Sequence, residues 1–116
     1  MKLPNLEAAM VPEEKITGYL LSATHREGRH KAAFFLGFGF GVESWQALAA
    51  ALLKHAADHD IASVEATPFG TRYVVEGTIE TPGGRTPRIR SVWFVENNQD
   101  TPRFVTAYPL EGAGND

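Results

Sequence analysis

The pattern of apolar and polar positions divides the chain into a helical first half and a β-strand second half. In the first half, apolar residues recur every three or four positions, the period of a helix with one buried face. The predicted helices cover residues 11–21, 29–37 and 45–59. In the second half, short runs of β-branched and aromatic residues alternate with turn residues, as in strands. The predicted strands cover residues 61–66, 71–81, 88–95 and 103–108.

Helices that come before a run of strands are typical of an α+β fold. Short turns such as Pro82–Gly84 favour antiparallel neighbours. We therefore expect N-terminal helices packed on one face of a four-stranded antiparallel sheet. With 116 residues, the chain predicts a single α+β domain over residues 1–110. Residues 1–11 are expected to form a loosely held arm, and residues 111–116 a disordered tail.

The same periodicity predicts the hydrophobic core and the helix and strand faces. The residues expected in the core are Tyr19, Leu20, Phe34, Phe35, Trp45, Leu48, Leu52, Val75, Trp93 and Val105. Ser44 is the expected N-cap of the third helix. Strict alternation along the last strand groups Phe104 with Thr106 and Tyr108 on one face. The opposite face then carries Arg103, Val105 and Ala107.

Composition narrows the classes of function. The net charge of −3 argues against a generally basic nucleic-acid binder. The absence of cysteine excludes disulfides and thiolate metal sites, and it fits a cytoplasmic protein. No apolar run is long enough to cross a bilayer, so no membrane association is expected.

Two groups of polar residues are candidates for chemistry. Residues 25–31 include His25 and end with three cationic or titratable residues at a predicted helix start, where positive charge opposes the helix dipole. That local cost favours a second purpose, in which His25 transfers protons and Lys31 binds an anion. The alternative is a solvated loop and helix start.

The predicted strands carry the second group. Arginine suits phosphate binding, and the strand arginines are Arg72, Arg88, Arg90 and Arg103. Thr106 and Tyr108 share a face and can hydrogen-bond a ligand. The alternative is a set of arginines lying flat across an exposed sheet, with Thr106 and Tyr108 packed at its edge.

A metal or cofactor is not expected. His55 and His59 have the spacing of two zinc ligands on a helix, but the sequence offers no evident third ligand. Favourable charge near a helix C-terminus explains them equally well. The glycines in Gly37–Gly41 do not follow a strand and open a long helix, as a dinucleotide fingerprint would require.

The chain resembles a small bacterial family catalogued as a domain of unknown function, some of whose members are labelled adhesins. The resemblance covers residues 1–110. It is carried by Gly18–Leu21, His25, Gly28-Arg29, Lys31-Ala32, Phe35, Thr67–Gly70, Arg72-Tyr73 and Pro102–Pro109.

The order of helices and strands in that family is similar to the fold shared by barnase, EndoU, the colicin ribonucleases and RelE-type toxins. Its members resemble parts of toxin–antitoxin pairs, polymorphic toxins and phage head proteins. The resemblance implies a metal-independent ribonuclease toxin, with RNA as substrate and a small antitoxin or immunity protein as partner. The catalytic residues that it implies are His25, Lys31, Arg72, Thr106 and Tyr108.

A second class of function is a non-catalytic module that binds a protein partner. The acidic net charge favours it. So does the aromatic turn Phe38–Phe40, because aromatic residues often anchor protein interfaces. The sequence leaves both classes open.

Overall fold

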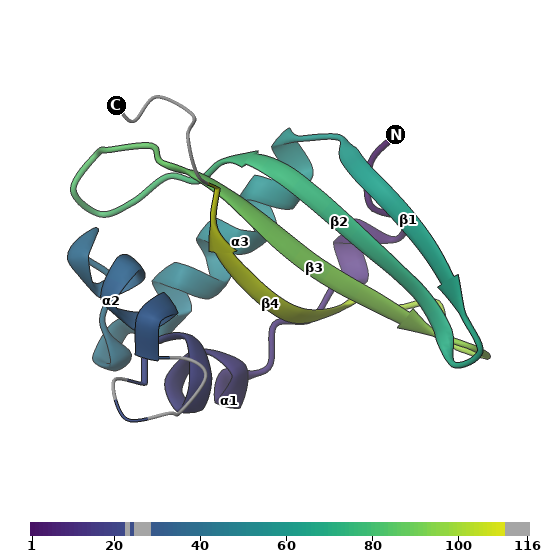
Figure 1. Cartoon of the computed structure of the whole chain (residues 1–116), viewed down its shortest axis with the longest axis horizontal. Coiled ribbons are helices and arrows are strands. Elements are labelled where there is room, and N and C mark those ends of the chain that lie inside the picture. The colour runs from purple at the N-terminus through teal and green to yellow at the C-terminus, as the bar shows by residue number, and fades with distance from the viewer. Residues whose placement is uncertain (23, 25–28, 111–116) are drawn as a thin grey trace.

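The structure of the protein is a computed structural model that describes residues 1–22, 24 and 29–110 (Figure 1). The helical elements are η1 (Leu6–Ala8), α1 (Glu13–Lys15), a π-helical turn η2 (Ile16–Leu20), α2 (Arg29–Gly37), η3 (Val42–Ser44) and α3 (Trp45–Asp58). The strands are β1 (Ile61–Thr67), β2 (Gly70–Thr78), β3 (Arg88–Glu96) and β4 (Arg103–Pro109). His25, one of the predicted site residues, lies outside the described residues. So does the predicted tail, residues 111–116.

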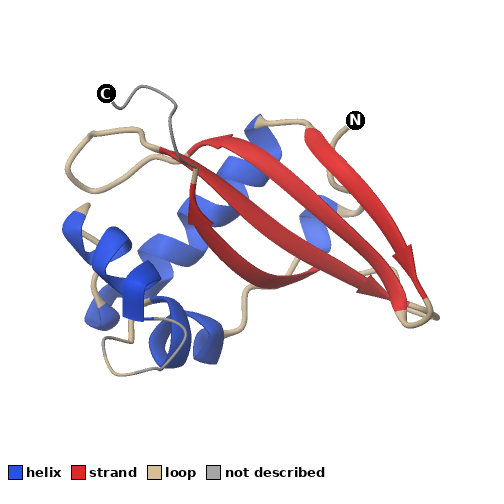
Figure 2. Cartoon of the chain, in the orientation of Figure 1, coloured by secondary structure: helices blue, strands red, loops and turns tan. Residues whose placement is uncertain are grey.

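The four strands form one antiparallel sheet in the order β1–β2–β3–β4. α3 runs behind this sheet, while α1 and α2 stand together at one end of it (Figures 1 and 2). The predicted α+β fold, with helices packed against a four-stranded antiparallel sheet, is therefore confirmed. Pro68 and Phe69 make a tight turn between β1 and β2, whereas residues 79–87 and 97–102 form longer connections. Each strand pairs with the next one in the chain.

The first predicted helix is divided in the structure, whereas the other two agree with α2 and α3. α1 makes a single turn, and the Leu21 N–H then donates to the Ile16 carbonyl at 2.8 Å, the spacing of a π-turn. Ser44 is the N-cap residue of α3, as expected, but its side chain makes no capping hydrogen bond. Among the described residues, no single helix is long and apolar enough to cross a bilayer. His30–Gly37 and Val42–Asp58 pass that test only as a pair bent by 73°.

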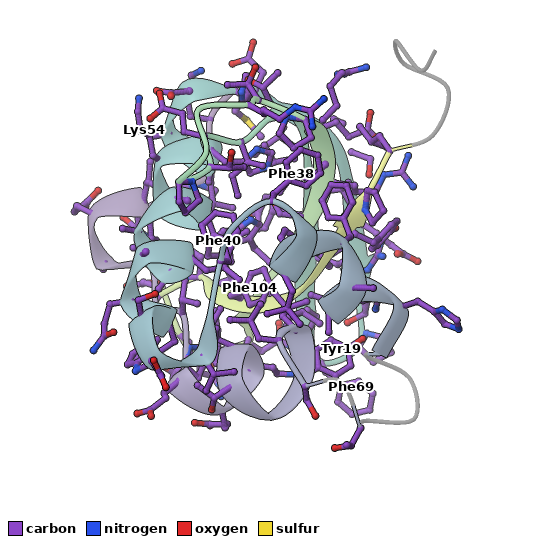
Figure 3. The ribbon with its side chains drawn as sticks, turned by 90° about the vertical axis from the view of Figure 1, so that its left-hand side faces the viewer. Tyr19, Phe38, Phe40, Lys54, Phe69 and Phe104 are labelled. Carbon is purple, nitrogen blue, oxygen red and sulfur yellow. The ribbon has the colours of Figure 1, made fainter. Side chains whose placement is uncertain are left out.

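The core lies between α3, the helical end and one face of the sheet. Six of the ten residues expected there are buried: Leu20, Phe35, Leu48, Leu52, Val75 and Trp93. Three others, namely Tyr19, Phe34 and Trp45, are half-buried and pack against the core. Phe40 and Phe104 point toward the middle of the molecule in Figure 3, and both are buried. Burial of Phe40 removes half of the aromatic turn as an interface anchor.

An irregularity in β4 changes which side chains face the core. Val92 pairs with Thr106 but Trp93 pairs with Phe104, so Val105 is an extra residue, a β-bulge. The bulge puts Phe104 and Ala107 in the core and turns Thr106 and Tyr108 to the other face. The predicted grouping of Phe104 with Thr106 and Tyr108 was therefore wrong, and Val105 is only half-buried.

We call the sheet surface opposite α3 the open face. Among the side chains that the register places on it are Glu65, Arg72, Val74, Glu76, Arg90, Val92, Phe94, Arg103, Thr106 and Tyr108. Val74 and Val92 are nevertheless buried, at 5% and 2% exposure. They form the middle row of this face, between two rows of long charged and aromatic side chains. The open face is therefore a polar surface with a narrow apolar floor.

The N-terminal segment is held at both of its ends, contrary to the expected loose arm. The Met1 carbonyl accepts the Ile61 N–H at 2.7 Å, and the Met1 amine lies 3.4 Å from the Asp60 carboxylate. Leu3 is buried, with 3% of its surface exposed. Further along, Met10 forms a parallel bridge with Arg103. Apolar burial and backbone pairing together outweigh the entropy that a free arm would keep.

A buried hydrogen-bonded set ties α3 to β3. The Trp93 Nε1–H donates to Ser91 Oγ at 2.9 Å, and Ser91 Oγ lies 2.9 Å from His55 Nε2. His55 Nδ1 lies 3.0 Å from the Thr78 carbonyl, which can only accept. Nδ1 therefore carries the hydrogen, and the Ser91 hydroxyl donates to Nε2. His55 is thus a neutral core residue that links helix to sheet.

His59 continues this set rather than forming a metal site. Its Nε2 lies 3.0 Å from the same Thr78 carbonyl. Gly77 makes room for its ring, because a Cβ there would lie 2.4 Å from the His59 side chain. Among the described residues, no group of three or more His, Asp or Glu side chains is placed to hold a metal ion.

Leu52 gives a test of the core. It lies on α3 and is fully buried, so Leu52→Ala should lower the free energy of unfolding by about 2–5 kcal/mol in urea denaturation. Leu36→Ala is the matched control, because Leu36 is 39% exposed, and its effect should be about 0.5 kcal/mol or less. Equal losses for the two variants would contradict the packing of α3.

His55 predicts how stability depends on pH. Burial lowers the pKa of His55 below its ordinary value. Above about pH 6.5 the ring is neutral in both states, and its contribution to stability is complete. As the pH falls below that value, the unfolded chain takes up a proton that the folded chain resists, so stability decreases.

Urea denaturation at several pH values between about 5 and 8 measures how the free energy of unfolding depends on pH. Removing the histidine with His55→Gln should flatten the fall on the acid side, even though the variant is less stable throughout. His30→Gln, at an exposed position of α2, should keep the wild-type profile. An unchanged slope in His55→Gln would show that the ring does not titrate as the structure requires.

Candidate functional site

Lys31 on α2 is the centre of a polar cluster at the helical end of the open face. Its ammonium donates to Thr106 Oγ1 at 3.1 Å and to the Tyr19 hydroxyl. The Tyr19 ring also lies below it, with the centroid 4.8 Å from Nζ. These partners come from a helix, a π-turn and a strand that are far apart in the sequence. All are neutral, so they hold the ammonium without cancelling its charge.

The π-turn explains how Tyr19 reaches Lys31. A π-turn widens the helix by one residue per turn, and such turns are frequent at functional sites. Ile16 and Leu20 both point into the core and are fully buried. Tyr19 is therefore left at the rim of the core, at the helical end of the molecule (Figure 3). From there its hydroxyl meets Lys31 and lies 3.5 Å from Thr106 Oγ1.

Tyr108 and Arg90 extend the cluster along the open face. The Lys31 ammonium lies 5.7 Å from the centroid of the Tyr108 ring, and the Arg90 guanidinium lies 5.7 Å from the same centroid. Arg90 Nη1 also donates to the Tyr108 hydroxyl at 3.3 Å. We call Tyr19, Lys31, Arg90, Thr106 and Tyr108 the Lys31 cluster. Two cations thus lie within reach of one tyrosine ring, whose π electrons attract them.

The cations of the open face differ in what neutralises them. Arg72 lies 3.7 Å from Glu65, Arg90 lies 2.5 Å from Glu76, and Arg103 lies 2.6 Å from Glu96. Hydrogen bonds to Tyr108 and Glu76 raise the pKa of Arg90. Lys31 has no such partner, and neither has Arg88 at the start of β3, for which the described residues show no ion pair. Within residues 1–22, 24 and 29–110, no carboxylate lies within 4 Å of the Lys31 ammonium.

The structure brings three of the five predicted site residues together. Lys31, Thr106 and Tyr108 meet in the cluster. Arg72 projects from the same face but from β2, two strands from β4, and its guanidinium turns to Glu65 on β1. His25 lies outside the described residues.

Two residues of the cluster were missed or only partly recognised in the sequence. Tyr19 was assigned to the core because its helical period matched Leu20, and a π-turn leaves no evident mark in a single sequence. Arg90 was one of four strand arginines, and only the register of β3 and β4 distinguishes it from the others. Its pairing with Tyr108 could not be expected without knowing of the bulge at Val105.

Two hollows in the described surface lie away from the cluster. One is lined by Met10, Glu96, Gln99, Thr101 and Arg103. The other is lined by Phe40, Ala47, Ala50, Ala51, Lys54, Glu80, Thr81 and Pro82. Neither brings an unneutralised cation together with hydroxyl groups, because Lys54 meets Asp58 and Glu80 while Arg103 meets Glu96.

The chain was compared with known proteins by sequence and by structure. The family model described as "Domain of unknown function (DUF6883)" matches residues 2–111. No curated protein sequence matches the chain. A chain of the solved structure "Contact-dependent growth inhibition toxin - immunity protein complex from Klebsiella pneumoniae 342" superposes with a TM-score of 0.69 and 19% identity. The match covers 88% of this chain and 100% of that one, and it shows a common fold.

The Lys31 contacts can be tested by NMR. Hydrogen bonds slow the exchange of an ammonium with water, so Lys31 should give a distinct side-chain ¹H–¹⁵N signal, assigned by its loss in Lys31→Arg. The double variant Tyr19→Phe/Thr106→Val removes both acceptors with little change of shape, and the signal should disappear. Thr86→Val, in an exposed loop, is the control. A signal that persists in the double variant would contradict the cluster.

Proposed function

We propose that this chain, which belongs to the DUF6883 family of domains of unknown function, is a toxin domain that cleaves RNA without a metal ion. The observation that carries the proposal is the Lys31 ammonium, which in the described part of the chain is held by hydroxyl groups and set beside a tyrosine and an arginine. The likeness of fold to a chain of a toxin–immunity protein complex supports a role in a toxin–immunity pair. Because RNA is the proposed substrate, the proposed place of action is the cytoplasm.

RNA cleavage of this kind asks for cations and for proton transfer. The ribose 2′-oxygen attacks phosphorus, the bond to the 5′-oxygen breaks, and the products are a 2′,3′-cyclic phosphate and a free 5′-hydroxyl. Negative charge grows on the phosphate oxygens in the transition state. Lys31 stabilises that charge, because a fixed cation in a half-buried site interacts with it more strongly than water does.

The other members of the cluster position the phosphate. The Thr106 and Tyr108 hydroxyls hydrogen-bond its oxygens, and Arg90 gives a second positive charge beside the Tyr108 ring. His25 precedes α2 in the sequence, and histidine is the side chain best suited to move a proton near neutral pH. Arg72 binds a neighbouring phosphate of the RNA, since Arg72 lies on the same face of the sheet but outside the cluster.

The alternative is a non-catalytic module that binds a protein partner. The three ion pairs of the open face favour it, because they leave most of this surface nearly neutral. Phe69 favours it as well, since it is 76% exposed at the turn between β1 and β2.

In the toxin proposal, a small immunity or antitoxin protein binds this chain and covers the Lys31 cluster.

Induced expression in a bacterium distinguishes the two functions. The wild type should arrest growth and degrade cellular RNA. Lys31→Ala should abolish both effects, because removing one charge-stabilising donor slows a reaction by about 10²–10³-fold. Arg72→Ala should weaken them without abolishing them. Lys54→Ala is the matched control, as Lys54 lies on α3 away from the cluster, and it should remain toxic.

Purified protein then identifies the chemistry. RNA fragments should end in a 2′,3′-cyclic phosphate, and an oligonucleotide of the same sequence with deoxyribose should stay intact. A harmless wild type with intact RNA would refute the ribonuclease. Lys31→Ala as toxic as the wild type would refute the site. A stable partner, captured by a chain that shows no cleavage, would favour the binding module.

A further inference from the structure

We propose that Glu76 is a built-in competitor of RNA phosphate for Arg90, so that the resting protein binds an RNA strand through Lys31 and few other phosphate contacts. The choice of RNA as ligand rests on the proposed function. The competition itself rests on the ion pairs of the open face, and it assigns to Glu76 a role in setting affinity and salt dependence.

The geometry of the Arg90–Glu76 pair is that of a bound oxyanion. Arg90 Nε donates to Glu76 Oε2 at 2.6 Å, and Arg90 Nη2 lies 2.5 Å from the same oxygen. The fork of a guanidinium binds a carboxylate and a phosphate in the same manner. The two side chains are 37% and 29% exposed, so an incoming phosphate can reach the pair and exchange with the carboxylate.

Arg90 also lies where a second phosphate contact would be useful. It and Lys31 are each 5.7 Å from the Tyr108 centroid. Lys31 has only neutral partners among the described residues, whereas Arg90 has a carboxylate. A strand that first contacts Lys31 therefore meets a competing negative charge at the next cation. Removing that charge should free one more phosphate contact.

The salt dependence of binding counts such contacts. For a single strand, the logarithm of the affinity falls with the logarithm of the salt concentration with a slope of about −0.7 for each phosphate neutralised. One further contact should therefore steepen the slope by about 0.7. At about 50 mM salt it should raise the affinity roughly eightfold, taking about 1 M salt as the reference.

The experiment measures binding of a fluorescein-labelled deoxyuridine oligonucleotide by fluorescence anisotropy over a series of salt concentrations. The probe has no 2′-hydroxyl group, so it is not cleaved. Glu76→Gln keeps the shape of the side chain and removes its charge. We expect tighter binding and a steeper slope. Glu80→Gln is the matched control, because Glu80 pairs with Lys54 away from the open face.

A double variant assigns the gain to Arg90. Arg90→Gln combined with Glu76→Gln should lose the added contact and return to the wild-type slope. Glu65→Gln, which frees Arg72 at a more exposed pair, should steepen the slope in the same direction and serves if Glu76→Gln folds poorly. Equal behaviour of Glu76→Gln and Glu80→Gln, or no binding by any variant, would overturn the proposal.

The outcomes separate this inference from the proposed function. Tighter binding by Glu76→Gln without RNA cleavage by the wild type would keep the competition and reject the ribonuclease. Cleavage by the wild type with no change of slope in Glu76→Gln would keep the ribonuclease and reject the competition.

Discussion

The polar cluster depends on one extra residue in the last strand. Without the bulge at Val105, a chain that buries Phe104 would also bury Thr106 and Tyr108, since side chains alternate between the faces of a strand. The bulge lets the same strand supply both the core and the open face. A hydroxyl and a phenol thereby reach Lys31 on α2, while Phe104 packs edge-on against Trp93 with 5.4 Å between ring centroids.

Overall acidity and a local anion site are compatible in this protein. A net charge of −3 acts mainly through distant carboxylates, and salt screens such interactions beyond about 8–10 Å at ordinary ionic strength. A half-buried ammonium is governed by its near neighbours instead. Lys31 has hydroxyl groups and aromatic rings around it, whereas Arg72, Arg90 and Arg103 have carboxylates. Position on the sheet, more than total charge, decides which cation is available.

The sequence predicted the fold because each predicted element has a strong local signal. The helical period of Leu48 and Leu52, and the β-branched runs around Val75 and Trp93, correctly indicate helices before an antiparallel sheet. The site was predicted in part. Lys31 was identified from its unfavourable place at a helix start, and Thr106 and Tyr108 from their shared strand face. The family resemblance pointed to all three.

What the sequence did not reveal depends on small departures from regular geometry. A bulge changes the face of every later residue in its strand, so the faces of β4 were assigned wrongly. A π-turn moves Tyr19 from the expected helix face toward Lys31. The anchoring of the N-terminal segment was missed for a different reason. Its partners, such as Asp60 and Arg103, are distant in the chain, and no local pattern announces them.

The anchoring of that N-terminal segment has a consequence for folding during synthesis on the ribosome. Within this domain the residues near Met1 are synthesised before the strands, but Met10 bonds to Pro102 and Phe104, and Asn5 donates to the Asp100 carbonyl across a separation of 95 residues. These contacts close only when nearly the whole domain has left the exit tunnel. Until then the N-terminal segment cannot connect β1 with β4. A nascent chain that stalls before β4 therefore keeps its beginning unfastened, which exposes it to chaperones and proteases.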